Sequence, residues 1–150
     1  MTSAPPLVHL PTETAAFTGC SLGASPDAPS RARSFTRHAL ACWDLAELTD
    51  DAQVIVSELL ANAIRHGRPG QHGRRWPAGT VAPALWLLRQ ANGIMCVVTD
   101  PSDLVPALKQ PLDSDECGRG LHVVHALSDH WGWTRLSDRG KAVWAILFQA

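Results

Sequence analysis

The sequence has almost no net charge, no long hydrophobic run and no closely spaced pair of cysteines, and each of these absences excludes a class of protein. The 13 Lys and Arg residues are balanced by 14 Asp and Glu residues, for a formal net charge of −1. Nucleic acid or a membrane surface therefore has little electrostatic reason to bind. No segment approaches the ~20 apolar residues of a membrane span, and the N-terminus lacks the basic and apolar regions of a signal peptide. We expect a cytoplasmic protein.

Cysteine spacing and the lack of common phosphate motifs exclude further classes. The four cysteines have no CxxC spacing, which favours reduced cytosolic thiols over a disulfide framework. They are Cys20, Cys42, Cys96 and Cys117. The chain has neither the GxxxxGKS/T motif of a P-loop nor a GxGxxG motif after a strand, so neither of these nucleotide fingerprints is present. One stretch, Arg65 to Arg75, is basic, and we interpret it as a solvated loop.

The order of the expected elements predicts the fold class. Residues 1–12 contain three prolines and are expected to form a mobile tail before a single domain over residues 13–150. Hairpin-linked strands need no crossover helix, so this order predicts an α+β two-layer sandwich with a mixed, mostly antiparallel sheet covered on one face by helices. The expected elements are an edge strand within Thr14–Leu22, helices over Ser30–Asp44 and Asp51–Gly67, strands at Val81–Gln90 and Ile94–Asp100, a helix opening at Gly118, and strands at Trp131–Arg135 and Lys141–Phe148.

The segment Asp51–Gly67 is the strongest helical pattern in the chain, and Asp50 or Asp51 can cap its start. One stripe of it is apolar, formed by Ile55, Val56, Leu59, Leu60, Ala63 and Ile64. Glu58 and Asn62 are four residues apart and therefore lie side by side at the edge of this stripe. A glutamate there is usually just solvated, whereas Asn62 is costly inside a helix and has no evident local benefit.

Two other positions carry candidate chemistry. Asp100 ends an apolar strand, where its carboxylate either starts an Asp-Pro turn or accepts a hydrogen bond from an exocyclic amine such as that of adenine. The run Gly118-Arg119-Gly120 opens a helix, where unpaired backbone N–H groups and the helix dipole favour a phosphate. By itself, such a run also fits a flexible helix cap.

These features occur in one order: the Glu58/Asn62 pair, then Asp100, then Gly118-Arg119-Gly120. In this order the sequence resembles the GHKL ATPase superfamily, which includes gyrase and histidine kinases. It is more closely similar to the anti-sigma-factor serine kinases, especially the small stand-alone members of actinobacteria. SELLANAIRHG is similar to their N-box, VTDPS stands at their first glycine box, and ECGRGLHVV is similar to their second; the resemblance covers roughly residues 31–150.

The resemblance implies a Bergerat-type fold with a pocket for ATP and Mg²⁺ between the helices and the sheet. On matching positions, Asn62 would hold Mg²⁺, Glu58 would be the catalytic general base, and Asp100 would accept the adenine amine. Residues 101–117 would form a lid. The start of the following helix would border the phosphates, through Gly118, Arg119, Gly120 and Leu121.

Two positions depart from the family pattern. Pro101 follows Asp100 where the first glycine box continues to a glycine, and Gly140-Lys141-Ala142 stands where many relatives carry a Gly-Thr that reaches the adenine. Thr99 is the candidate replacement for that contact.

As to activity, the resemblance implies a protein serine/threonine kinase that regulates transcription. It would phosphorylate a serine of a small antagonist protein and bind a sigma factor or a similar regulator, and a homodimer is left open. Neither a membrane nor a nucleic acid is expected as a partner. The alternative is a non-catalytic interaction module with a degenerate or purely structural nucleotide site, which the missing Gly and Thr favour.

Overall fold

The computed structural model describes residues 16–23, 25–66, 83–100, 120–136 and 140–150, and it confirms the predicted order of elements. The elements are β1 (Phe17–Ser21), α1 (Ala28–Cys42), the 3-10 helix η1 (Ala46–Leu48), α2 (Thr49–His66), β2 (Ala84–Gln90), β3 (Gly93–Asp100), α3 (Gly120–Leu127), β4 (His130–Arg135) and β5 (Lys141–Phe148). The predicted tail over residues 1–12 lies outside the described residues. No helix in the described ranges has the length and hydropathy needed to cross a membrane.

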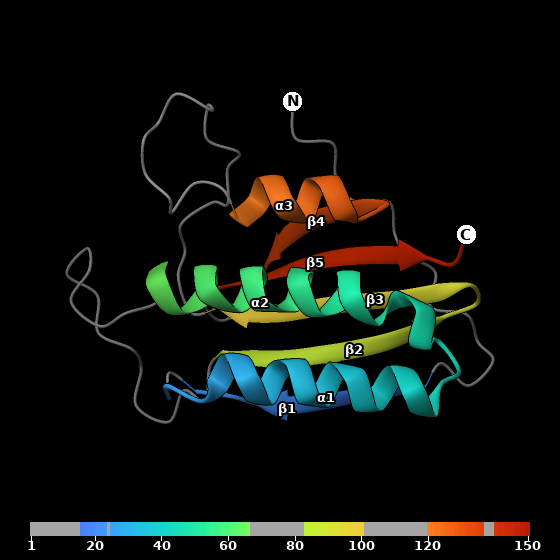
Figure 1. The fold of residues 1–150 in the computed structure, drawn as a ribbon. Helices are drawn as coiled ribbons and strands as arrows, with labels where there is room; N and C mark the ends of the chain where they lie inside the picture. Colours follow the sequence, from blue (N-terminus) through green and yellow to red (C-terminus); the bar gives the residue numbers. More distant parts are fainter. Residues whose placement is uncertain (1–15, 24, 67–82, 101–119, 137–139) are drawn as a thin grey trace.

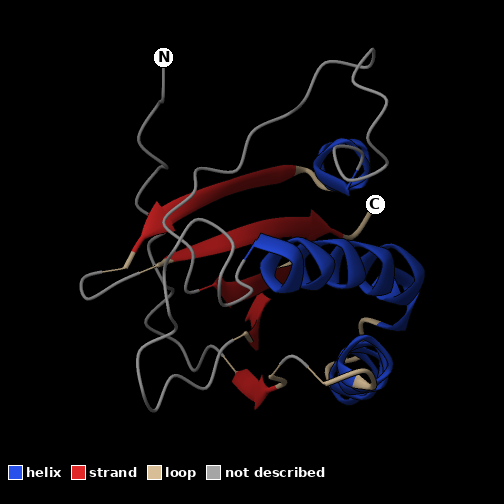
Figure 2. Cartoon of the chain, turned by 90° about the vertical axis from the view of Figure 1, so that its left-hand side faces the viewer, coloured by secondary structure: helices blue, strands red, loops and turns tan. Residues whose placement is uncertain are grey.

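The five described strands form one sheet in the order β1-β2-β3-β5-β4. Each neighbouring pair is antiparallel, so the described sheet is purely antiparallel where the sequence predicted a mixed, mostly antiparallel one. Figure 1 shows α1 and α2 running along the sheet, and in the perpendicular view of Figure 2 the three α-helices lie on one side of the strands. The predicted α+β two-layer arrangement is therefore confirmed.

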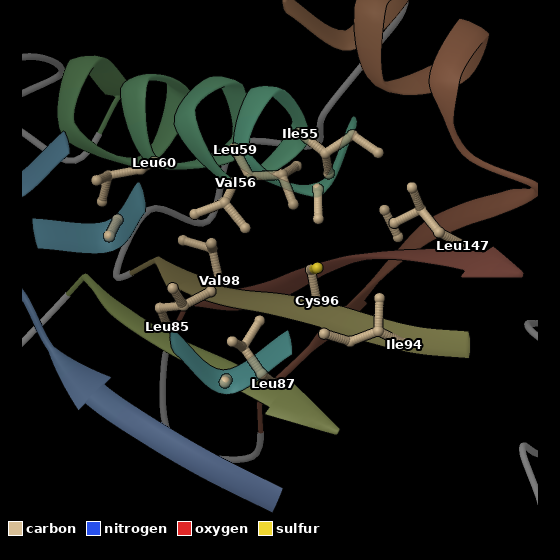
Figure 3. Packing of buried hydrophobic residues seen from close by; sticks show 14 of the residues in the cluster. Ile55, Val56, Leu59, Leu60, Leu85, Leu87, Ile94, Cys96, Val98 and Leu147 are labelled. Atoms are coloured by element: carbon tan, nitrogen blue, oxygen red, sulfur yellow. The ribbon is translucent and has the colours of Figure 1, made fainter. Parts of the chain in front are cut away.

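The core lies between this helical layer and the sheet. The apolar stripe predicted on α2 is buried apart from the half-buried Ile64, and Ile55, Val56 and Leu60 are fully shielded from solvent. Figure 3 shows the α2 side chains pointing toward side chains of β2, β3 and β5, among them Leu85, Leu87, Ile94, Cys96, Val98 and Leu147. Burying one such aliphatic side chain contributes about 1.5–3 kcal/mol, so this contact anchors α2 on the sheet.

From Ile94 to Asp100, buried and half-buried residues alternate along β3. Ile94, Cys96 and Val98 belong to the core, so Asp100 continues the same inward row at the end of the strand. Burial raises the pKa of the Cys96 thiol to about 12, which keeps the thiol protonated and inert. The carboxylate of Asp100 therefore lies at the end of an otherwise apolar row of side chains.

The start of α2 differs from the sequence prediction. The helix begins at Thr49, directly after η1, so Asp50 and Asp51 lie in its first turn and do not cap it. Acidic side chains in a first turn are still favourable, because the N-terminal end of the helix dipole is positive. The helix is described as far as His66, and the predicted stop at Gly67 lies outside the described residues.

Candidate functional site

Two elements end and two others begin on the same side of the molecule. Figure 1 shows the C-terminal end of α2, the end of β3, the start of β5 and the start of α3 together on the left of the view. Three of the polar residues singled out in the sequence, Glu58, Asn62 and Asp100, lie on α2 or on the helix-covered face of the sheet, toward these ends. The fold therefore gathers residues that are far apart in the chain.

Helix α2 supplies the first pair, Glu58 and Asn62. Both side chains are half-buried, at the border between the fully buried stripe and solvent. The helical spacing predicted that they are neighbours, and the packing of α3 against α2 decides what they face.

The partner of this pair is Gly120, the first residue of α3. A Cβ atom placed on Gly120 would lie 2.7 Å from Oε2 of Glu58 and 3.4 Å from both Nδ2 and Oδ1 of Asn62. The glycine therefore allows the backbone at the start of α3 to approach the carboxylate and the carboxamide closely. The first N–H groups of a helix have no intrahelical acceptor, so donors, a carboxylate and an amide oxygen meet at one point.

We expect Gly120→Ala to weaken Mg-ATP binding at least about tenfold. The new methyl group would fill the space beside Glu58 and Asn62, so these two side chains would have to move from the positions in which they bind the ligand. The closest atom is the end of the flexible Glu58 side chain, which can turn aside at little cost, so the melting temperature should change little while the affinity falls. Calorimetric titration together with thermal unfolding separates the two effects. A double variant that also carries Glu58→Ala restores space, and its affinity should be no lower than that of Glu58→Ala alone. An unchanged affinity in Gly120→Ala would contradict the placement of the site.

Arg65 brings a positive charge to the same pair. Its Nη1 donates to Oδ1 of Asn62 at 3.5 Å, one turn further along α2. A guanidinium beside the amide is suited to a site that receives phosphate oxygens. The remainder of the predicted basic loop, after residue 66, lies outside the described residues.

Asp100 and Lys141 form the second part of the site. Asp100 is 4% exposed, and Nζ of Lys141 lies 2.9 Å from its Oδ2. The two residues face each other directly in the antiparallel pairing of β3 with β5. In the sequence, Lys141 is visible only as a departure from Gly-Thr, although a lysine at the head of the apolar strand KAVWAILF indicates a charge that needs a buried partner.

Thr99 lies on the opposite face of the sheet from Asp100, because neighbouring strand residues alternate. Its hydroxyl donates to the carbonyl of Ala84 at 3.4 Å and accepts from the Ala84 N–H at 3.3 Å. This placement directs Thr99 away from the helical layer and gives no support to its predicted contact with adenine. The Ala142 side chain, opposite Thr99 in the strand pairing, offers no hydroxyl either.

The remaining predicted site residues are only partly described. Leu121 follows Gly120 in α3 and is buried, 8% exposed, so its side chain belongs to the packing of the helix. Gly118, Arg119 and the predicted lid over residues 101–117 lie outside the described residues.

The donor set fits a magnesium ion that is held through a nucleotide. In the described ranges there is no group of three His, Cys, Asp or Glu side chains that could hold a metal by itself. Mg²⁺ typically uses one or two protein oxygens and completes its shell with phosphate oxygens and water. The amide oxygen of Asn62 is such a ligand, and the close approach of Gly120 leaves the neighbouring helix N-terminus as a place for phosphate.

Comparison with known proteins agrees with this geometry. A family model described as a histidine kinase-like ATPase domain matches residues 22–147. The match spans the elements from α1 to β5 and contains the described site residues on α2, β3, α3 and β5. No curated protein matches the chain.

Proposed function

Because this chain belongs to the family of histidine kinase-like ATPase domains, we propose that it is an ATP-dependent regulatory serine kinase of the anti-sigma-factor type. Membership of the family implies an ATP site, commonly with Mg²⁺. The kinase activity and the partners go beyond the family and are our proposal.

One observation carries the proposal: Gly120 at the start of α3 lies against both Glu58 and Asn62. A carboxylate and an amide oxygen beside a glycine at a helix N-terminus supply the three groups that phosphoryl transfer needs, namely a base, a metal ligand and phosphate donors. An amphipathic helix that served only packing would have no use for this combination, since Asn62 costs helix stability.

The roles of the residues follow from their chemistry. Asn62 would hold Mg²⁺, which offsets phosphate charge when it is bound. Glu58 would take the proton from a serine hydroxyl while the serine oxygen forms its bond to the γ-phosphorus and the bond from that phosphorus to the ADP oxygen breaks. Asp100 would accept the 6-amino group of adenine. Leu121 and Thr99 have no role in this scheme, because Leu121 packs in the helical layer and Thr99 faces away.

The partners of the proposed kinase are an antagonist protein with a target serine and a sigma factor or similar regulator. The similarity of SELLANAIRHG and ECGRGLHVV to the anti-sigma-factor kinases supports this choice. In this scheme the protein binds the regulator when the antagonist is phosphorylated, so that phosphoryl transfer controls transcription.

The test uses γ-labelled ATP and purified small antagonist proteins that carry candidate serines. We expect wild-type protein to label its antagonist. Glu58→Gln should lose at least about a hundredfold in transfer rate, which is the contribution of a general base. Its Mg-ATP affinity should stay within about threefold of the wild-type value, since the amide replaces a group that ground-state binding does not need. Glu47→Gln is the matched control, because Glu47 is exposed on η1, where it accepts a hydrogen bond from Gln149, and lies away from Glu58 and Asn62. Labelling by Glu58→Gln at the wild-type rate would refute the role of Glu58.

The second candidate is the non-catalytic interaction module. The Lys141–Asp100 ion pair favours it, because the carboxylate proposed to read adenine already has a buried partner within the protein. In this case Mg-ATP would raise the melting temperature without any transfer of label to an antagonist.

A further inference from the structure

Strand β5 is buried on both of its faces, although the described helices cover only one face of the sheet (Figure 2). Residues 141–147 are all buried. They include Ala142, Trp144 and Ile146, which alternate with the core residues of the strand and therefore face away from the helices. The continuous apolar run 142–148 is typical of a strand that is covered on both sides. A further layer is therefore needed over the face opposite the helices.

This face, which we call the outer face, has no Asp, Glu, Lys or Arg in its described rows. Residues that pair directly across antiparallel strands share a face, so each row crosses the sheet from β1 to β4. The rows are Phe17/Leu88/Met95/Ile146/His130, Gly19/Trp86/Val97/Trp144/Gly132 and Ser21/Ala84/Thr99/Ala142/Thr134. An antiparallel sheet with one face in water normally places polar residues there. The first two rows do not fit that pattern.

The two tryptophans lie across glycines of the edge strands. A Cβ atom on Gly19 would lie 2.4 Å from the Trp86 ring, and one on Gly132 would lie 2.6 Å from the Trp144 ring. Trp144 is only 7% exposed, whereas Trp86 is 41% and Phe17 68% exposed. The cover of the outer face therefore lies over β5 and leaves the β1–β2 side partly open.

The composition of the segments outside the described residues indicates which of them fits this surface. Residues 67–82 carry three arginines, and residues 101–119 carry six charged side chains. A charged side chain is costly against an apolar surface. Residues 1–15 contain Glu13 as their one charged side chain, and they include the apolar residues of the run Leu7-Val8-His9-Leu10. The N-terminal segment is therefore the best match for an uncharged face.

The N-terminal segment also starts from the right place and has the required length. It joins the sheet at β1, an edge strand whose residue Phe17 belongs to the outer face. Strand β5 is three strand spacings away, about 15 Å, and fifteen extended residues span up to about 50 Å. The prolines at positions 5, 6 and 11 have no N–H group. They lower the number of backbone donors that contact with an apolar face would leave without an acceptor.

We propose that residues 1–15 cross the outer face of the sheet and cover it, with Leu7, Val8 and Leu10 packed against the residues of β5. The segment then forms a third layer of the domain, in place of the mobile tail expected from the sequence. Because the outer face is opposite the helices, this inference does not depend on the proposed function.

The experiment measures the rate at which the thiol of Ile146→Cys reacts with a maleimide in the full chain. Ile146 is 7% exposed on the outer face, and peptide mapping by mass spectrometry separates the new thiol from the four native cysteines. Adding Leu7→Asp/Leu10→Asp should raise the rate at least about tenfold, because carboxylates do not remain on an apolar surface. The melting temperature should fall by at least about 6 °C, since apolar burial is lost.

Two controls show whether the effect belongs to this contact. Thr2→Asp/Ser3→Asp adds the same charges to polar positions of the same segment and should change the rate by less than about twofold. Val143→Cys tests the other face of β5, because Val143 is 8% exposed but belongs to the core beneath the helices. Its thiol should react slowly with or without the N-terminal substitutions.

The outcomes separate the possible covers of the outer face. If Leu7→Asp/Leu10→Asp leaves the rate of Ile146→Cys unchanged, another segment covers the face and the inference is wrong. A rate that falls with rising protein concentration and ignores the N-terminal substitutions would assign the face to a second copy, which also overturns it. If the double substitution prevents folding, Leu10→Ala should raise the rate at least about threefold, and an unchanged rate there counts equally against the inference. Absence of Mg-ATP binding in wild-type protein would refute the proposed function alone.

Discussion

Asn62→Ala is expected to lower the affinity for Mg-ATP by about tenfold to a hundredfold, the range seen when the surroundings of a metal are disturbed. The loss should depend on magnesium, because the amide oxygen is the group proposed to hold the ion. In the presence of a chelator, wild-type and variant protein should bind ATP with similar, weaker affinity. Calorimetric titration with and without Mg²⁺ measures both quantities.

The stability of Asn62→Ala should move in the opposite direction from its affinity. Asn62 lies within α2, where alanine is favoured over asparagine by about 0.5 kcal/mol. A rise or no change in melting temperature, together with weaker binding, would show that Asn62 was retained for the site. Asn92→Ala is the matched control, because Asn92 is exposed in the turn between β2 and β3. Equal Mg-ATP affinities of wild-type protein and Asn62→Ala would remove Asn62 from the site.

Gly93→Ala is expected to lower the free energy of unfolding by about 3 kcal/mol or more, the upper end for overpacking. A Cβ atom on Gly93 would lie 1.9 Å from the carbonyl oxygen of Leu147 and 2.9 Å from Cα of Phe148. Both atoms belong to the backbone of β5, so no side-chain rotation can relieve the clash. The strands β3 and β5 would have to separate where Gly93 pairs with Phe148, at the start of β3 and the end of β5.

Thermal unfolding measures this effect directly. A loss of about 3 kcal/mol corresponds to a fall of about 10 °C in melting temperature for a domain of this size. Asn92→Ala again serves as the control, since it places alanine one position earlier, in the exposed turn before β3, and should change the melting temperature by less than about 2 °C. A melting temperature of Gly93→Ala within that margin would show that the strands are not packed as closely as the structure has them.

Local sequence patterns predicted the elements well. The apolar stripe of α2 and the neighbouring Glu58 and Asn62 followed from a period of 3.6 residues, and the β2–β3 hairpin followed from the turn before Gly93. Alternation along β3 also implied that Thr99 and Asp100 face opposite sides, a signal that was available in the sequence and conflicted with giving both residues to one site. The start of α2 was misplaced by two residues, because η1 leads directly into the helix.

The sequence by itself determined the kinds of element, their order and the polar side chains that each presents, because backbone geometry repeats over a few residues. Only the tertiary structure decided that β5 lies between β3 and β4, that Lys141 meets Asp100, and that Gly120 touches the Glu58/Asn62 pair. These contacts join residues that are 41 and 62 or 58 positions apart in the chain. No local period encodes them, since they arise when the apolar faces of separate elements are buried together in one core.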